Sequence, residues 1–331
     1  MRALVVTNIY PTEAHPATGT FIADQVRSIC EIGVEVDLLF VDRARQGRRV
    51  YQTLSGHTQT RVATSEPHIV HVMYGGVMAD IVTRVITDRP VLVTFHGDDL
   101  QGNRGNGLVG ALSGRYSTAA SARAARRAAG IITVSRTLFE ALPKSLDSSR
   151  VWTIPNGIDL SRFTPRDRTE CQHELGWNPR RAHILFPAPP ARGEKRFPLA
   201  NAAVRVLERS GIGVELHVLD AVPHDQVPMW LNASNAMVLT SIREGSPMVV
   251  KEALACNVPI VSVDVGDVRE RLTGIEGCFM ADPTPVDLSA KLRRVIERDD
   301  RIDGRDRVAD LALERVAAKL QEIYGVLTNE R

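Results

Sequence analysis

The stretch that decides the fold is residues 241–261, which read SIREGSPMVVKEALACNVPIV. It predicts a loop, a helix and then a buried strand, the order expected where helices alternate with the strands of a parallel sheet. Ser246 is expected to cap the helix, and Pro247 to occupy its first position, where a proline is tolerated. The unpaired N–H groups and the dipole of such a helix start favour binding of a phosphate.

Two glutamates flank this predicted helix start. Glu244 lies just before it, and Glu252 lies roughly 9 Å along the helix axis from Ser246, at about 1.5 Å per residue. The side chain of Glu252 leans back toward the helix start, because side chains on a helix tilt toward its N-terminus. The two carboxylates are therefore placed to hold the ends of one elongated ligand with an anion between them. A nucleotide-sugar has that shape.

The composition is that of an ordinary globular protein. The 331 residues are 44% hydrophobic and 24% charged, and a chain of this length favours two domains. The formal net charge of +2 is too small to indicate binding to nucleic acid. The four cysteines lack the spacing of a zinc site or a disulfide framework, and no apolar run is long enough for a signal peptide or a membrane span. We therefore expect a cytoplasmic protein.

Short apolar runs alternate with helical patterns along nearly the whole chain. Two sets of strands are predicted, the first at 3–7, 34–41, 69–72, 91–95 and 131–134 and the second at 182–186, 214–219, 236–239 and 259–263. This alternation predicts an α/β fold with two doubly wound parallel-sheet domains. Residues 154–163 are rich in turn formers and predict a connector between the two sets. Residues 42–65 are polar without a clear period, and their structure stays open.

The chain resembles family 4 of the retaining glycosyltransferases. Residues 244–252 are similar to the Glu-x7-Glu signature of this family, and residues 155–159 to its Pro-Asn-Gly-Val/Ile-Asp segment. The resemblance implies the GT-B fold, in which two Rossmann-like domains face each other across a cleft. The acceptor-side domain would span 1–163 and the nucleotide-sugar-binding domain 164–305, and a C-terminal helix in 306–331 would cross back to the first domain.

The resemblance also implies the residues that bind the donor. The donor sugar and phosphate are expected to contact Glu244 and the backbone of Gly245, Ser246, Pro247, Met248 and Val249. Glu252 is expected to bind the ribose hydroxyls. In the loop after the 182–186 strand, Lys195 matches the lysine that clamps the diphosphate. The family's arginine stands five residues earlier, where this chain has Pro190, so Arg192 is the expected substitute.

The loops of the first domain carry the other expected site residues, because ligands of open parallel sheets bind outside the carboxyl ends of the strands. Gly19 precedes a helical pattern, and the resemblance implies that it faces the donor phosphates. His96 follows the 91–95 strand and resembles the family's histidine that contacts the donor sugar near the reacting centre. Asp98 and Asp99 are the candidates for orienting the acceptor. His68 and His71 are interpreted as structural residues.

The implied reaction is metal-independent transfer from a nucleoside-diphosphate sugar with retention of configuration. A covalent mechanism needs two carboxyl groups close together, at a separation of about 5–5.5 Å in glycosidases. Glu244 and Glu252 are too far apart in the sequence pattern to form such a pair. In this family the acceptor is instead thought to attack the donor sugar from the same face that the diphosphate leaves. No Asp-x-Asp motif stands in a plausible position, so we expect neither a metal nor another cofactor.

The acceptor stays open among a glycan, a lipid-linked molecule and a small molecule. Arg123, Arg126 and Arg127 share one face of a predicted helix. Such a face can meet a phosphorylated acceptor or anionic lipid, which would give a peripheral contact with the inner membrane surface, but it is more often simply exposed.

Two other functions fit the same scaffold, since a fold does not determine its chemistry. One is a nucleotide-sugar epimerase or hydrolase, which would work without an acceptor. The other is a nucleotide-sugar-binding partner subunit that has lost catalysis. The presence of His96, Lys195 and Glu244 favours the transferase.

Overall fold

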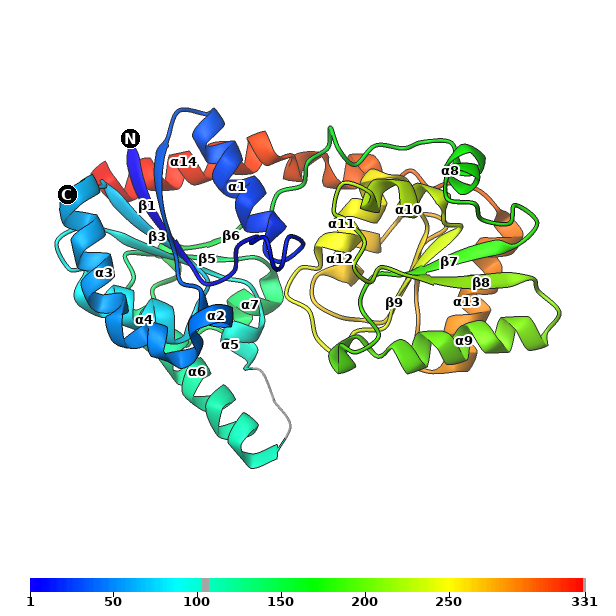
Figure 1. Ribbon diagram of the computed structural model, residues 1–331, viewed down its shortest axis with the longest axis horizontal. Helices are drawn as coiled ribbons and strands as arrows, with labels where there is room; N and C mark the ends of the chain where they lie inside the picture. The colour runs from blue at the N-terminus through cyan, green and yellow to red at the C-terminus, as the bar shows by residue number, and fades with distance from the viewer. Residues whose placement is uncertain (103–106, 330–331) are drawn as a thin grey trace. The chain divides into compact units, whose positions relative to one another are not determined.

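The computed structural model describes residues 1–102 and 107–329, and the chain divides into two compact units. Unit 1 comprises Met1–Gly157 together with Leu313–Arg331, and unit 2 comprises Ile158–Ala312. Each unit contains one parallel sheet with helices on its faces (Figure 1). The predicted fold class of two Rossmann-like parallel-sheet domains is confirmed.

Unit 1 is built on a six-stranded sheet in the order β2-β1-β3-β4-β5-β6. Its strands are β1 Arg2–Thr7, β2 Glu35–Phe40, β3 Ile69–Met73, β4 Val91–Phe95, β5 Gly130–Thr133 and β6 Val151–Thr153. The edge strand β6 was not predicted, because none of its three residues is fully buried and it lacks the apolar run of a central strand. The strand order reverses between β1 and β3, and the loops that follow these two strands diverge there.

Two separate apolar cores lie on the two faces of this sheet. α1 (Thr20–Glu31) and α14 (Leu313–Asn329) pack together on one face (Figure 1). The other face is covered by α3 (Val50–Ser65), α4 (Gly76–Val85) and α6 (Gly107–Arg127). The connections contain the short helices α2 (Arg43–Gln46), α5 (Asp98–Gln101) and α7 (Arg136–Glu140), and the 3-10 turns η1 (Gly47–Arg49) and η2 (Ser148–Arg150).

Helix α3 fills most of the region whose structure stayed open. Its buried residues are Val50, Leu54, Thr58 and Val62, one in each turn. So narrow a stripe, with a threonine in it, does not give the wide apolar face by which a surface helix is usually predicted.

The arginine face of α6 contributes to helix packing. Arg123 Nη2 and Arg127 Nη2 both donate to the carboxylate of Asp80 on α4, each at 2.8 Å, and Asp80 is buried. These two arginines thus stay partly exposed, as expected for such a face, while an acidic residue of α4 lies opposite them and pairs with both. No helix in the described part of the chain is both long enough and apolar enough to cross a membrane.

Unit 2 is built on a five-stranded sheet in the order β11-β10-β9-β7-β8. Its strands are β7 Ala182–Phe186, β8 Val214–Val218, β9 Ala236–Leu239, β10 Ile260–Ser262 and β11 Phe279–Met280. α9 (Phe197–Arg209) and α13 (Pro285–Arg298) lie on one side of this sheet, and α8 (Arg168–Glu174), α10 (Val227–Ala233) and α11 (Met248–Ala255) on the other (Figure 1). The remaining elements are α12 (Val268–Leu272) and the 3-10 helices η3 (Gly193–Lys195) and η4 (Arg305–Leu311).

His71 is a structural residue at the centre of unit 1, as interpreted from the sequence. Its ring is fully buried, with Nδ1 2.6 Å from the Tyr324 hydroxyl of α14 and Nε2 2.7 Å from Thr94 Oγ1 of β4. Burial lowers the pKa of His71 to about 3. His68 precedes β3, and its Nδ1 accepts a hydrogen bond from the backbone N–H of Arg2 at 3.0 Å.

We expect unit 1 to lose stability as the pH falls below about 6.5. Unfolded His71 binds a proton there, whereas the folded ring does so only near its lowered pKa of about 3. Its contribution is complete above the unfolded pKa and declines by about 1.4 kcal/mol for each pH unit below it. The free energy of opening from amide exchange in β3, at about pH 5 and about pH 7, measures this change. In His71→Asn that part of the pH dependence should vanish; an equal dependence in both proteins would contradict the assignment.

Candidate functional site

The strand order of unit 2 reverses between β7 and β9, and the loops after these strands carry two predicted donor residues. Lys195 closes η3 after β7, and Glu244 lies in the loop after β9. Lys195 Nζ donates to Glu244 Oε1, and the two side chains are only 16% and 14% exposed. The structure thus joins the predicted diphosphate lysine and the predicted sugar carboxylate in one largely buried ion pair.

Hydrogen bonds between the two loops hold this pair in place. The hydroxyl of Thr240 donates to the Lys195 carbonyl at 2.7 Å, and the N–H of Ile242 donates to the Glu194 carbonyl at 2.8 Å. Arg196 Nε donates to the Thr240 carbonyl at 2.5 Å. Arg192, the expected substitute for the family's arginine, is 56% exposed and pairs with Glu194 at 2.7 Å. Arg196, rather than Arg192, is therefore the arginine that links this loop to the loop after β9, and its role there is structural.

The start of α11 differs from the expectation. The helix begins at Met248 with Pro247 as its N-cap, so Ser246 is not the capping residue. The Ser246 hydroxyl donates instead to Asp267 Oδ2 at 2.7 Å, and Arg271 Nε donates to the same oxygen at 3.3 Å. The hydrogen bond that the Ser246 hydroxyl donates to a carboxylate is stronger than the one that an N-cap serine accepts from a neutral backbone N–H.

The loop that carries Glu244 rests against Gly266, which follows β10. Gly266 has a φ of +59°, and a Cβ atom there would lie 2.8 Å from the Gly245 carbonyl oxygen and 3.1 Å from that of Glu244. Both the backbone conformation and the close approach require glycine. Nothing in the sequence pattern had marked this residue, because its partner loop is about twenty residues away in the chain.

Glu252 is held by a chain of side chains that reaches back to the connector. Its side chain is 9% exposed, and His224 Nε2 lies 3.5 Å from Oε1. Arg162 Nη1 donates to His224 Nδ1 at 2.9 Å. Since a guanidinium only donates, Nδ1 is the acceptor and the ring proton lies on Nε2, facing Glu252. His224 is thus the partner of Glu252, and it was not anticipated from the sequence because it stands in an irregular loop without a motif.

In unit 1, His96 follows β4 as expected. Its ring centroid lies 5.3 Å from that of Phe21 and 6.0 Å from that of Tyr74, on which it is stacked at 11°. Gly19 is the N-cap of α1 at a φ of +76°, and a Cβ there would lie 2.8 Å from the backbone of Ile9 and Tyr10. This position also requires glycine. His96 and Gly19 both lie at the carboxyl edge of the sheet, as predicted.

Asp99 has a structural role in the loop after β4. Its side chain is buried, and its carboxylate accepts backbone N–H groups of Gly75 at 2.8 Å, Gly97 at 2.8 Å and His96 at 3.1 Å. Burial raises the pKa of Asp99, while these hydrogen bonds oppose the rise. With its oxygens occupied, Asp99 orients the His96 loop, and the expectation that it faces an acceptor is not supported. Asp98 is exposed.

A pocket of about 440 Å³ lies at the switch point of unit 1. Asn8, which follows β1, and Tyr74, which follows β3, lie in its wall. The other lining residues are Arg43, Arg48, Tyr51, Gly75, Gly76, Val77, Leu112, Ser113, Tyr116 and Ser117. It combines aromatic rings with two exposed arginines, and Tyr74 connects it to His96.

Comparison with known proteins identifies the two halves of the chain. Residues 11–162 match the model of "Glycosyltransferase Family 4", and residues 193–298 match that of "Glycosyl transferases group 1". TuaC of Bacillus subtilis (strain 168), named as a teichuronic acid biosynthesis glycosyltransferase, is 25% identical over 81% of this chain and 82% of its own length. A D-inositol 3-phosphate glycosyltransferase of Geodermatophilus obscurus is 26% identical over 56% of this chain, which spans about half (49%) of that relative.

Solved structures agree in fold over the whole length. A sucrose-phosphate synthase from Thermosynechococcus elongatus superposes with a TM-score of 0.83 at 15% identity, covering 100% of both chains. Anabaena HepE in complex with UDP-glucose gives a TM-score of 0.69 at 14% identity, covering 98% of this chain and 100% of its own. The two family models, the relatives and the shared two-domain fold lead to one conclusion: the chain belongs to the family 4 glycosyltransferases of GT-B fold.

Proposed function

We propose that this glycosyltransferase uses a nucleoside-diphosphate sugar and transfers the sugar, with retention and without a metal ion, to a hydroxyl of an anionic acceptor. The observation that carries the proposal is the buried Lys195–Glu244 ion pair at the switch point of unit 2, with the buried carboxylate of Glu252 on α11. Ligands of open α/β sheets bind at this position.

The donor diphosphate takes over Lys195 from Glu244. When the sugar–phosphate bond breaks, negative charge collects on the departing diphosphate, and the ammonium group stabilises it together with N–H groups at the start of α11. Glu244, released from the ion pair, accepts hydrogen bonds from sugar hydroxyls. Because a protein cation already offsets the charge of the leaving group, a metal ion is not needed there.

Glu252 binds the ribose of the nucleotide. A carboxylate accepts hydrogen bonds from two neighbouring hydroxyls, and the His224 N–H orients Glu252. HepE, which has the same fold, was solved with UDP-glucose, and this supports a nucleoside-diphosphate sugar as the donor.

We assign retention of the anomeric configuration to a mechanism in which the acceptor hydroxyl attacks the sugar from the face that the diphosphate leaves. A covalent route needs a carboxylate that is free to act as nucleophile. In unit 2, Glu244 pairs with Lys195 and is then occupied by the sugar hydroxyls, and in unit 1, Asp99 accepts backbone N–H groups. The diphosphate oxygen that leaves takes the acceptor proton, and His96 contacts the donor sugar.

The pocket of unit 1 receives the acceptor. Arg43 and Arg48 supply two cations that suit a phosphate or carboxylate, and the tyrosines supply faces for the rest of the molecule. The relatives named as D-inositol 3-phosphate glycosyltransferases act on a small phosphorylated cyclitol, which is an acceptor of this class.

Glu252→Ala and His224→Ala should both weaken the binding of nucleoside diphosphates, Glu252→Ala by about ten-fold or more, since hydrogen bonds to a charged group contribute about 1.5–3 kcal/mol. Thermal shift with UDP, GDP, ADP and their common sugar conjugates measures the effect, because a ligand at 100 times its Kd stabilises the fold by about 2.7 kcal/mol. Glu208→Ala, on the exposed side of α9, is the matched control. Unchanged affinity in both variants would remove this chain of residues from the site, and the absence of any shift in the wild type would favour the inactive partner.

Lys195→Ala should lower turnover by about 10²–10³-fold, because it removes a charge that acts in the transition state. Arg192→Ala should have a much smaller effect, since that side chain is exposed and pairs with Glu194. Nuclear magnetic resonance of the product, formed with and without EDTA, should show the donor's anomeric configuration and an unchanged rate. An inverted product, or a rate that EDTA abolishes, would refute the mechanism, and free sugar as the main product would indicate the hydrolase.

Arg48→Gln and Arg43→Gln should raise the acceptor KM by about ten-fold each and leave donor binding intact, because each removes one cation from the pocket. Assays with inositol and inositol phosphates, and with matched sugars and sugar phosphates, should show a preference for the phosphorylated acceptors that these variants lose. Arg45→Gln is the matched control, since Arg45 lies between the two in the chain and is exposed outside the pocket. Equal rates with neutral and phosphorylated acceptors would contradict the assignment.

A further inference from the structure

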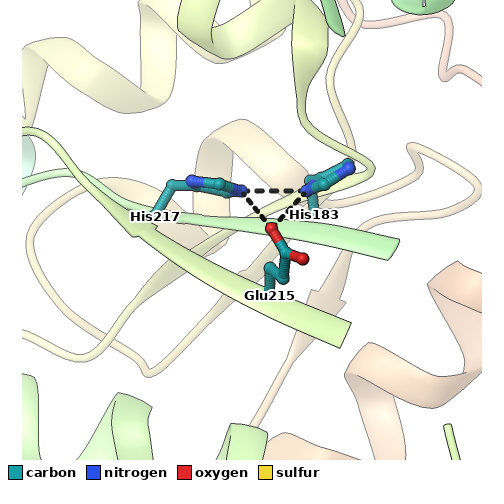
Figure 2. Close-up of side chains that lie close together, drawn as sticks. All are labelled: His183, Glu215 and His217. Atoms are coloured by element: carbon teal, nitrogen blue, oxygen red, sulfur yellow. Dashed lines mark hydrogen bonds and ion pairs between the residues drawn. The ribbon is translucent and has the colours of Figure 1, made fainter. Parts of the chain in front are cut away.

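Three side chains of unit 2 meet on one face of its sheet, over the edge strand β8 and its neighbour β7. Glu215 and His217 alternate on the edge strand β8 and therefore share a face, and His183 on β7 is paired in register with Glu215 (Figure 2). His183 is fully buried, whereas His217 and Glu215 are 16% and 33% exposed, so the group is open to solvent on one side only.

The distances within this group fit one bound cation. His183 Nδ1 lies 2.9 Å from His217 Nε2, and Glu215 Oε2 lies 3.8 Å from each nitrogen. A point equidistant from three atoms with separations of 2.9, 3.8 and 3.8 Å lies about 2.1 Å from each, and zinc binds imidazole nitrogen and carboxylate oxygen at about 2.0–2.2 Å. His183 Nδ1 and His217 Nε2 face each other without the ion, and both rings rotate toward Glu215 when it binds.

The surroundings hold the ligands as those of a metal site do. His183 Nε2 donates to the Asn178 carbonyl at 2.9 Å, which leaves the lone pair of Nδ1 directed at the group. Arg181 Nε forms an ion pair with Glu215 Oε1 at 3.3 Å, and Oε2 lies toward the two rings. Trp177 stacks on His217 with ring centroids 3.5 Å apart, and Trp230 lies edge-on at 6.3 Å.

The second carboxylate oxygen, Glu215 Oε2, is the feature that neither a simple histidine pair nor the Arg181 ion pair explains. Two neutral imidazoles satisfy each other through one N–H···N hydrogen bond, but Glu215 Oε2 lies beyond hydrogen-bonding distance of both rings. An anionic oxygen equally far from two nitrogens is the arrangement that a shared cation would complete. Among the described residues, His183, Glu215 and His217 are the one group of three histidine, cysteine or acidic side chains whose ligand atoms lie close enough together to share an ion.

We propose that His183, Glu215 and His217 bind a divalent transition-metal ion, with zinc as the best match, and that the ion fastens the edge strand β8 to β7. Two imidazoles and one carboxylate are a recurring zinc ligand set, and water would fill the fourth position. On binding, the His217 proton moves from Nε2 to Nδ1, so each ring stays neutral. His183 is the second residue of β7, whereas Lys195 follows the other end of that strand. The ion therefore takes no part in the proposed transfer.

The test is a titration of the full chain, freed of tags and stripped of metal, with Zn²⁺ followed by calorimetry and tryptophan fluorescence. We expect one ion per chain, with a Kd at least ten-fold weaker in Glu215→Gln and in His217→Gln, and an increase in melting temperature in the wild type that these two variants lose. Co²⁺ should give the visible absorption of a tetrahedral site. His173→Gln, an exposed histidine of α8, is the matched control and should bind like the wild type.

Three results would overturn the proposal: no zinc bound by the wild type, an unchanged Kd in both ligand variants, or a Kd that changes only in Glu252→Gln, which would place the ion at His224 and Glu252. Glu215→Gln keeps the shape of a partly exposed side chain, and the amide introduced by His217→Gln retains a donor toward His183, so both variants should fold. Donor binding by the stripped enzyme should equal that of the zinc form, which separates this test from that of the proposed function.

Discussion

The constraint on which the rest of this protein depends is the parallel direction of its strands. Because all strands of a sheet run the same way, their carboxyl ends meet at one edge, and the loops diverge only where the strand order reverses. Along the strands themselves the side chains are mostly aliphatic and buried, so charged groups collect beyond that edge. In unit 2 this position holds Lys195 and Glu244, and in unit 1 it holds the pocket between Asn8 and Tyr74.

Keeping charges at such a place costs free energy, and the fold supports them with fixed partners. A largely buried ion pair gains little stability after the loss of hydration, so Lys195 and Glu244 are better explained by what they bind than by what they stabilise. Glu252 depends on a longer chain of contacts. The carboxylate of Asp159 accepts the N–H of Arg162 at 3.0 Å and so shapes the turn from which Arg162 reaches His224. A segment that reads as a connector thus positions a ligand group some ninety residues later.

The sequence predicted those features that follow from local pattern. Nine strands have apolar runs and were located within a few residues, whereas β6 and β11 are two or three residues long at sheet edges and carry no such run. Lys195, Glu244, Glu252, Gly19 and His96 were singled out by their motifs, and the structure joins Lys195 to Glu244; their roles in binding stay predictions. Ser246 and Asp99 were misread, since a partner distant in the chain decides where a short polar side chain bonds: Asp267 for Ser246, and the backbone of Gly75 for Asp99. Gly266, His224 and the group around His183 were missed for the same reason, although the alternation of Glu215 and His217 on one strand was a signal that could have been read.

The two ends of β7 show how one strand can serve two kinds of chemistry. Beyond its carboxyl end, an ammonium group and backbone N–H groups face the place of a diphosphate, whose hard anionic oxygens pair well with such donors. Near its amino end, neutral imidazoles and a carboxylate offer lone pairs, which suit a borderline-soft cation. The groups beyond the carboxyl end are hydrogen-bond donors, whereas those near the amino end offer lone pairs. The donors do not compete for a metal ion, and the lone pairs do not compete for a diphosphate. If both proposals hold, separation along the strand lets unit 2 bind a cation without placing one at the leaving group, where Lys195 supplies the positive charge.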